Sequence, residues 1–330
     1  MKLWKILFLV FLIAASVYVI SNEPPYHTDR GFTFGTYYNI CYKSKQNVQH
    51  KIDSTLKSID NSLSPFNKRS IITAINENRD TLPDAQFLAV FNLAQEISAA
   101  TNGSFDITVA PLVNAWGFGF KQGTKVDSLT VDSLLQYVGY KKVSLANGKI
   151  TKQHPAIMLD CSAIAKGYGC DRIAHLFQSI GIDNYMIEIG GEVVAKGKND
   201  KSKRWSIGIS KPTDDPTGAN TSLQEILQIS GRSIATSGNY RNYRYEDGRK
   251  VSHTIDPRTG RPVEHTLLSA TVIADNCATA DAYATAFMVM GLDSAMQICN
   301  RQGLDAYFIY STPEGSIATQ ETEGMKKYHK

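Results

Sequence analysis

The stretch AIMLDCSAIAKGYGCDRIAHLFQSIGIDNYMIEIGGEVVAK, residues 156–196, contains the pattern that decides the fold class. The apolar run Ala156–Leu159 predicts a strand, and the apolar spacing after Ser162 predicts an amphipathic helix that begins there. Two β-rich runs follow, Tyr185–Ile189 and Glu192–Lys196, and the Gly-Gly pair between them is typical of a hairpin. Strands grouped between helices, with no regular strand–helix alternation, predict an α+β fold with a largely antiparallel sheet.

The same kinds of pattern continue on both sides of this stretch. Upstream, we expect a strand over Phe32–Tyr42 and helices over Ile52–Leu63 and Phe87–Ile97. Downstream, the sequence predicts strands over Trp205–Ser210, Leu227–Ser230, Leu267–Asp275 and Leu304–Tyr310, helices over Ala280–Met290 and Leu292–Arg301, and loops over 121–135 and 211–223. We therefore expect one domain over residues 31–330, with helices flanking the sheet.

The N-terminus is typical of a targeting segment. Lys2 and Lys5 precede an almost entirely apolar run over residues 6–20, which is long for the apolar core of a signal peptide but shorter than the roughly 20 residues that span a membrane. We expect residues 1–21 to be a signal peptide or an uncleaved membrane anchor, and residues 22–30 to be a linker. The protein would then be exported, either into the periplasm or to the periplasmic side of the inner membrane.

Composition excludes several classes of protein. With 42% hydrophobic residues the chain can bury a core, which excludes a disordered protein, and the single long apolar run excludes a polytopic membrane protein. The formal net charge of +4 arises largely at the two ends of the chain, so the body carries no basic surface for nucleic acid. Five cysteines without CxxC spacing argue against a disulfide scaffold or a zinc site.

The segment Asp160–Gly169 is a candidate phosphate site. Gly167 and Gly169 each cost about 1 kcal/mol relative to alanine inside a helix, so something should pack closely against the backbone there. A helix N-terminus with Lys166 nearby suits a phosphate group. Tight helix–sheet packing with a solvated Lys166 would explain the same residues, and both interpretations remain open.

Three further segments could carry chemistry. Asp281 and Thr285 are four residues apart on one helical face, and their oxygens suit Mg²⁺; a helix-capping aspartate beside a threonine bonded to its own helix is the alternative. His253 precedes an Asp-Pro turn and could accept a proton, or it could be a surface residue of a hairpin. The aromatic segment 103–119 could stack a planar ring or form a small core beneath a loop.

Taken together and in order, six segments resemble the ApbE-type flavin transferases, the FAD:protein FMN transferases. They are SFDITVAPLVNAWGFG, DCSAIAKGYGCDRI, EIGGEV, TSGNYRNY, SHTIDPRTGRP and ADAYATAF. The resemblance implies a single ApbE-like domain that binds FAD and Mg²⁺. It also implies transfer of FMN from FAD to a threonine hydroxyl of a target protein, with release of AMP, and a target that is a subunit of a membrane redox complex.

The resemblance also implies roles for individual residues. The metal would be held by Asp281, Thr285 and the backbone carbonyl of Ala163, and His253 would be the general base. FAD would contact Phe66, Ser104, Phe105, Asp106, Asp160, Lys166 and Ile255. The chain departs from the usual pattern at three positions: Phe34 replaces a methionine, Phe66 a tyrosine or tryptophan, and Asn239 an aspartate.

Two other functions are compatible with these residues. An FAD pyrophosphatase would use water in place of the threonine hydroxyl and produce FMN and AMP. A non-enzymatic FAD-binding module would retain FAD without depending on Asp281 or His253.

Overall fold

The fold is built on one antiparallel sheet. The computed structural model describes residues 3–4, 7–12, 23–119, 126–212, 222–239, 243–246 and 249–330. Eight strands lie in the order β1-β2-β5-β6-β9-β12-β13-β14, and every neighbouring pair is antiparallel. Their bounds are β1 Tyr26–Thr33, β2 Thr36–Lys43, β5 Tyr185–Ile189, β6 Glu192–Lys196, β9 Arg232–Gly238, β12 Leu267–Ala274, β13 Asp305–Ser311 and β14 Ile317–Glu321. The expected α+β class is confirmed.

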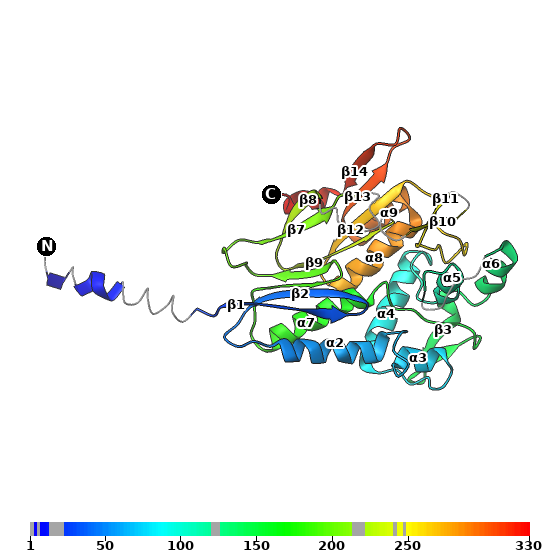
Figure 1. The fold of residues 1–330 in the computed structure, drawn as a ribbon, viewed down its shortest axis with the longest axis horizontal. Coiled ribbons are helices and arrows are strands. Elements are labelled where there is room, and N and C mark those ends of the chain that lie inside the picture. Colours follow the sequence, from blue (N-terminus) through cyan, green and yellow to red (C-terminus); the bar gives the residue numbers. More distant parts are fainter. Residues whose placement is uncertain are drawn as a thin grey trace.

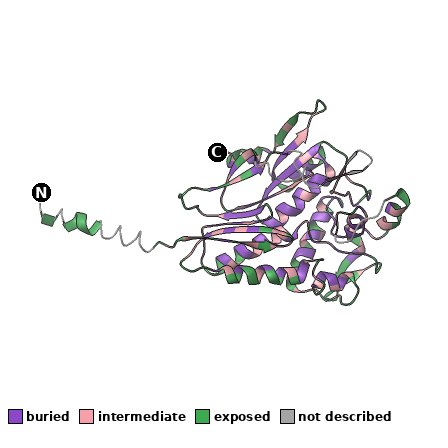
Figure 2. Ribbon diagram, in the orientation of Figure 1, coloured by how far each residue is buried: buried purple, intermediate pink, exposed green. Residues whose placement is uncertain are grey.

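Helices cover one face of this sheet (Figure 1). They are α2 Gln49–Leu63, α4 Ala85–Ala100, α7 Ala165–Ser179, α8 Cys277–Met290 and α9 Leu292–Gln302. One apolar cluster joins α4, α8 and α9 to β12 and β13, and a second joins α2 and α7 to β2 and β5. Figure 2 shows the buried residues concentrated along the central strands and the helices that face them.

The opposite face is covered by the hairpin of β7 (Trp205–Ser210) and β8 (Leu223–Ile229) and by the C-terminal 3₁₀ turn η2 (Glu323–Tyr328). Strand β6 contributes to both sides, because successive side chains in a strand point to opposite faces. Val194 packs with the helices, whereas Val193 and Ala195 pack with the hairpin. The sheet therefore forms the middle layer of the domain.

The remaining elements are short. They are α3 Ile71–Asn76, α5 Ala110–Ala115, α6 Ser128–Leu135, η1 Tyr140–Lys142, the hairpin β3–β4 (Val143–Ala146 and Lys149–Lys152) and the hairpin β10–β11 (Tyr243–Glu246 and Arg249–Ser252). Of these, α3, α5, α6 and β3 gather at one end of the molecule, at the right in Figure 1.

Helices α7 and α8 cap each other at the centre of the fold. The carboxylate of Asp171, on α7, accepts the backbone N–H groups of Cys277 and Ala278 at 2.7 and 2.9 Å. In return, Asp281 of α8 accepts the N–H of Gly167, in the first turn of α7, at 3.0 Å. These bonds satisfy N–H groups that a helix cannot pair by itself. They also set the distance between the two helices.

The start of the chain differs from the expectation. The predicted strand Phe32–Tyr42 is a hairpin instead, because Phe34 and Gly35, with φ of 51° and 75°, form a two-residue turn between β1 and β2. Residues 26–30, expected to belong to a linker, lie in β1. There Asp29 is buried and accepts hydrogen bonds from Tyr42 and Asn47.

Two predictions for residues 156–196 are wrong. Helix α7 begins at Ala165 rather than at Ser162, because Ser162 donates its N–H and hydroxyl to Asp160 in a tight turn. Residues 156–159 join no strand ladder. Instead, the side chain of Asn76 hydrogen-bonds both the N–H and the carbonyl of Leu159.

Several elements were not predicted from the sequence, among them α6 and β9, and one prediction is only partly described. Helix α6 lies inside the expected loop 121–135, where Asp127 caps it by accepting the N–H of Thr130. Strand β9 was not predicted, although it lies in the middle of the sheet. The expected loop 211–223 lies largely outside the described residues.

The expected targeting segment is also described only in part. Residues 3–4 and 7–12 are helical and exposed, whereas 13–22, with the expected cleavage region, lie outside the described residues. No helix in the described ranges is both long and apolar enough to span a membrane. All five cysteines lie in the described part, none is in a disulfide, and four are buried.

Gly167→Ala should destabilise the protein. A Cβ at this position would lie 2.3 Å from the carbonyl oxygen of Cys277, so α7 and α8 would have to separate. We expect a loss of about 1–3 kcal/mol, as for other overpacked sites, measured by urea unfolding. Ser179→Ala, at the exposed end of the same helix, should have little effect. Equal stability of the two variants would show that the interface tolerates the extra methyl group.

Candidate active site

A cavity of about 1200 Å³ opens between the helices and the loops beside them. All eleven residues singled out from the sequence lie on its wall: Phe66, Ser104, Phe105, Asp106, Asp160, Ala163, Lys166, His253, Ile255, Asp281 and Thr285. They come from segments spread between residues 66 and 285, and the fold brings them together. Their individual roles remain predictions.

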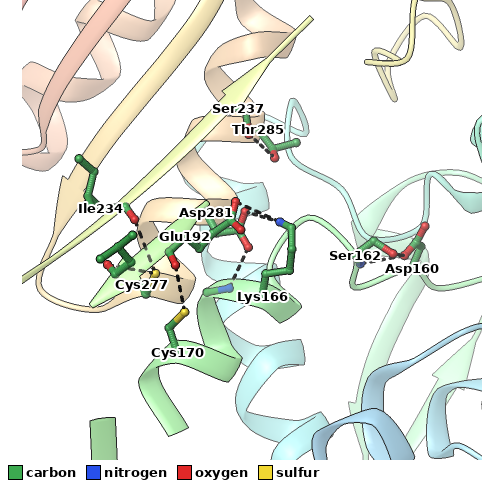
Figure 3. A network of polar contacts seen from close by, with 12 residues as sticks. Asp160, Ser162, Lys166, Cys170, Glu192, Ile234, Ser237, Cys277, Asp281 and Thr285 are labelled. Carbon is green, nitrogen blue, oxygen red and sulfur yellow. Dashed lines mark hydrogen bonds and ion pairs between the residues drawn. The ribbon is translucent and has the colours of Figure 1, made fainter. Parts of the chain in front are cut away.

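A lysine between two buried carboxylates lies at the centre of the site (Figure 3). The Nζ of Lys166 is 3.1 Å from Glu192 Oε1 and 3.5 Å from Asp281 Oδ1. Both acidic residues are almost inaccessible, with 3% and 1% of their surfaces exposed. Sequence reasoning had not proposed Glu192, although it lies in the EIGGEV motif at the start of β6.

Burial and charge shift the acid–base behaviour of this trio. Burial raises the pKa of Glu192 to about 8, although the nearby Lys166 opposes the shift. Burial lowers the pKa of Lys166, but the carboxylates of Asp281 and Glu192 outweigh it and hold that pKa above its ordinary value. Lys166 is therefore a cation at neutral pH.

This geometry bears on the packing interpretation of residues 160–169, while the phosphate site stays a prediction. The glycines do reflect close packing: Gly167 lies against the backbone of α8, and a Cβ on Gly169 would lie 2.8 Å from the ring of Phe34. The tight-packing interpretation is therefore right for the glycines. Its second half is wrong, because Lys166 is held by two carboxylates at the cavity wall rather than solvated.

Asp281 and Thr285 do not match the alternative interpretation, in which the aspartate caps its own helix and the threonine bonds to that helix. Asp281 caps α7 rather than its own helix, and its burial shows that it is not a surface carboxylate. The hydroxyl of Thr285 is 3.2 Å from the hydroxyl of Ser237, on β9. Both side chains line the cavity, one helical turn apart, as the four-residue spacing predicts.

The donor set suits a hard cation such as Mg²⁺. Ala163 lies just before α7, which begins at Ala165, and no hydrogen bond among the described residues reaches its carbonyl. A carboxylate, a hydroxyl and a carbonyl are therefore available, and Mg²⁺ prefers such oxygen ligands. The described residues contain no group of three or more His, Cys, Asp or Glu side chains that could hold a metal. Asp281 would be the charged ligand.

The loop before α5 forms another part of the cavity wall. Asp106 accepts the N–H and the hydroxyl of Thr108 at 2.8 and 2.6 Å and the N–H of Tyr140 at 2.6 Å. Burial raises the pKa of Asp106, and these hydrogen bonds oppose the shift. Its carboxylate thus anchors the loop, whereas the buried hydroxyl of Ser104 has no hydrogen-bond partner among the described residues.

His253 and Phe66 also line the cavity. His253 follows β11 and its ring lies edge-on to that of Phe118, with the centroids 6.3 Å apart. The turn after it forms as predicted: Gly260 has a φ of 71° and donates its N–H to Asp256. Phe66 is 69% exposed, so one face of its ring can stack on a planar ligand.

Comparison with known proteins agrees with this geometry. The model of the ApbE family matches residues 34–308. The chain belongs to the ApbE family. Its relatives include the FAD:protein FMN transferases of Vibrio cholerae serotype O1, 38% identical over 86% of this chain and 87% of that protein, and of Haemophilus influenzae, 33% identical over 96% and 95%.

Solved structures of ApbE proteins share the fold. The flavin transferase ApbE from Vibrio cholerae matches with a TM-score of 0.83 at 33% identity, covering 92% of this chain and 99% of that one. The Pseudomonas stutzeri flavinyl transferase ApbE, in its apo form, matches with a TM-score of 0.82 at 28% identity, covering 92% and 97%. The single-domain ApbE architecture expected from the motifs is therefore present.

Glu192→Gln should make the stability of the protein less dependent on pH. Because the pKa of Glu192 in the folded protein, about 8, lies above its ordinary 4.5, the native state binds this proton more tightly than the unfolded chain does. The stability that Glu192 contributes is fully present below its unfolded pKa and is lost as pH rises through the folded pKa. Urea unfolding at about pH 5 and pH 8 should show a larger fall in the unmodified protein than in the variant. Identical falls in both proteins would assign the pH dependence to other groups.

Proposed function

We propose that this ApbE-family protein is an FAD:protein FMN transferase. It needs Mg²⁺, modifies a threonine hydroxyl of a target protein and releases AMP. The observation that carries the proposal is that Lys166, Asp281 and His253 face one cavity large enough for a dinucleotide. Family membership and the names of its relatives support the same activity.

The reaction is a displacement at phosphorus. The acceptor hydroxyl attacks the phosphorus atom of the FMN half of FAD, a new P–O bond forms, and the P–O bond to AMP breaks. Such transfers depend on positioning and charge neutralisation more than on covalent help from the protein. Mg²⁺, when bound, would neutralise charge on the diphosphate and on the departing AMP.

The residues of this chain supply the remaining roles. Lys166 lies where it can pair with a phosphate oxygen, and the unpartnered hydroxyl of Ser104 can hydrogen-bond the substrate. Phe66 offers an exposed ring for stacking. His253 would accept the proton that the threonine hydroxyl loses, so that the attacking oxygen becomes a better nucleophile.

The sequence supports a proposal for the partner and the location. We propose that the acceptor is a subunit of a membrane redox complex, as the resemblance to the family implies. The basic and apolar residues of segment 1–21 support export, with the domain in the periplasm or anchored to the inner membrane through that segment. Co-expression with candidate subunits, followed by flavin fluorescence of the separated proteins in a gel, tests this. FMN release from FAD without any acceptor would instead favour an FAD pyrophosphatase.

Asp281→Asn should abolish Mg²⁺-dependent transfer. The amide oxygen can still accept the N–H of Gly167, so the fold should survive, but the charged metal ligand is lost. We expect turnover to fall about 100-fold or more, because a hydroxyl and a carbonyl compete poorly with the hydration of Mg²⁺. Asp293→Asn, on the exposed part of α9, is the control. Near-normal turnover of Asp281→Asn at millimolar Mg²⁺ would remove Asp281 from the metal site.

His253→Ala should slow transfer and spare FAD binding. Loss of a general base typically costs about 10²- to 10⁴-fold in rate, and the pH–rate profile should lose its rising limb near neutral pH. FAD affinity, measured by flavin fluorescence quenching, should hardly change because the base acts on the acceptor. His175→Ala, exposed on α7, is the matched control. If FAD affinity falls in proportion to the rate, His253 is a binding residue and the base lies elsewhere.

A further inference from the structure

We propose that Glu192 is a positioning residue that draws Lys166 away from Asp281 and so keeps the Asp281 carboxylate available for a divalent cation. The inference deepens the proposed function, because it rests on the cation site that includes Asp281. It gives Glu192 a role in the site that the proposed function does not include.

The positions of the three side chains carry the argument. Lys166 Nζ contacts Asp281 through Oδ1 at 3.5 Å, whereas Asp281 Oδ2 is taken by the N–H of Gly167. The oxygen that Lys166 contacts is therefore the one left for a cation, and the lysine and the cation compete for it. Lys166 lies nearer to Glu192, at 3.1 Å.

The Glu192 carboxylate could also bind the Lys166 ammonium group through both of its oxygens. Its second oxygen, Oε2, is buried and has no hydrogen-bond partner among the described residues. A buried carboxylate oxygen without a partner is costly, so a second contact with the ammonium group would be favourable. When a cation occupies Asp281, Lys166 can thus move onto both oxygens of Glu192 without leaving the cavity wall.

The charges agree with this arrangement. Above the Glu192 pKa of about 8, both acids are ionised, and two carboxylates with one ammonium carry a net charge of about −1. That charge attracts a divalent cation to a site with little solvent screening. Without the charge of Glu192 the lysine would pair with Asp281 alone, and the two groups would cancel. A cation would then have to displace a buried ion pair.

A double-mutant cycle tests the inference. Mn²⁺ serves as the probe, and its binding to the purified full-length protein is measured at a pH above the Glu192 pKa of about 8, so that this carboxylate is ionised. The measurements are calorimetry and the electron paramagnetic resonance signal of free Mn²⁺. Glu192→Gln should weaken Mn²⁺ binding about tenfold or more, because Lys166 then neutralises Asp281. Adding Lys166→Met to that variant should restore the affinity to at least that of the unmodified protein, because the competitor is gone.

The matched control is Glu188→Gln. This residue lies on the neighbouring strand β5 but alternates with Ile187 and Ile189, which face the helices, so it lies on the other face of the sheet. The same substitution there should leave Mn²⁺ binding unchanged. Thermal unfolding of every variant checks that the fold is retained, and the unmodified protein sets the reference affinity.

Each outcome is informative. Failure of Lys166→Met to restore Mn²⁺ binding would show that Glu192 is itself a ligand or a purely structural residue, and the inference would be wrong. Equal Mn²⁺ affinity of Glu192→Gln and the unmodified protein would overturn it while leaving the cation site in place. No Mn²⁺ binding by the unmodified protein would overturn the cation site of the proposed function and this inference with it.

Discussion

The exchange of capping bonds between α7 and α8 is the interaction on which the site depends. Asp171 accepts two N–H groups at the start of α8, and Asp281 accepts the N–H of Gly167 at the start of α7. A carboxylate at a helix N-terminus is stabilised both by these hydrogen bonds and by the helix dipole. The exchange requires the two backbones to approach so closely that a side chain at residue 167 does not fit. Packing and chemistry are therefore coupled in this pair of helices.

The features of the candidate cation site follow from this contact. Gly167 donates its N–H to Asp281, and the Ala163 carbonyl, just before the helix, keeps no hydrogen-bond partner among the described residues. Because Asp281 is buried, it needs a counter-charge, which Lys166 supplies, and Lys166 in turn lies against Glu192. Strand β9 then places the small hydroxyl of Ser237 beside Thr285. One helix–helix contact thus organises oxygens from four segments.

Polar residues around the cavity divide into two kinds. The carboxylates of Asp106 and Asp160 accept hydrogen bonds from neighbouring residues of their own loops, and so they shape the wall. Ser104 and Glu192 each keep one buried oxygen without a partner among the described residues. Since unpaired buried polar groups are costly, these two atoms are the more informative guides to where a ligand binds.

The sequence alone determined the α+β class, the helices α2 and α4, the β5–β6 hairpin and, through the order of its motifs, the ApbE family. Periodicity and turn chemistry are local properties, so a single chain displays them. Strand β9 escaped prediction because Arg232–Gly238 contains few large apolar side chains and is held in place by its neighbours in the sheet. Ser162 looked like a helix cap, but Asp160 competes for its N–H and hydroxyl. Only the tertiary structure decided that Gly167 faces the backbone of α8 and that Lys166 lies between Glu192 and Asp281. Those contacts join residues more than 20 positions apart, and their strength depends on burial, which no local pattern encodes.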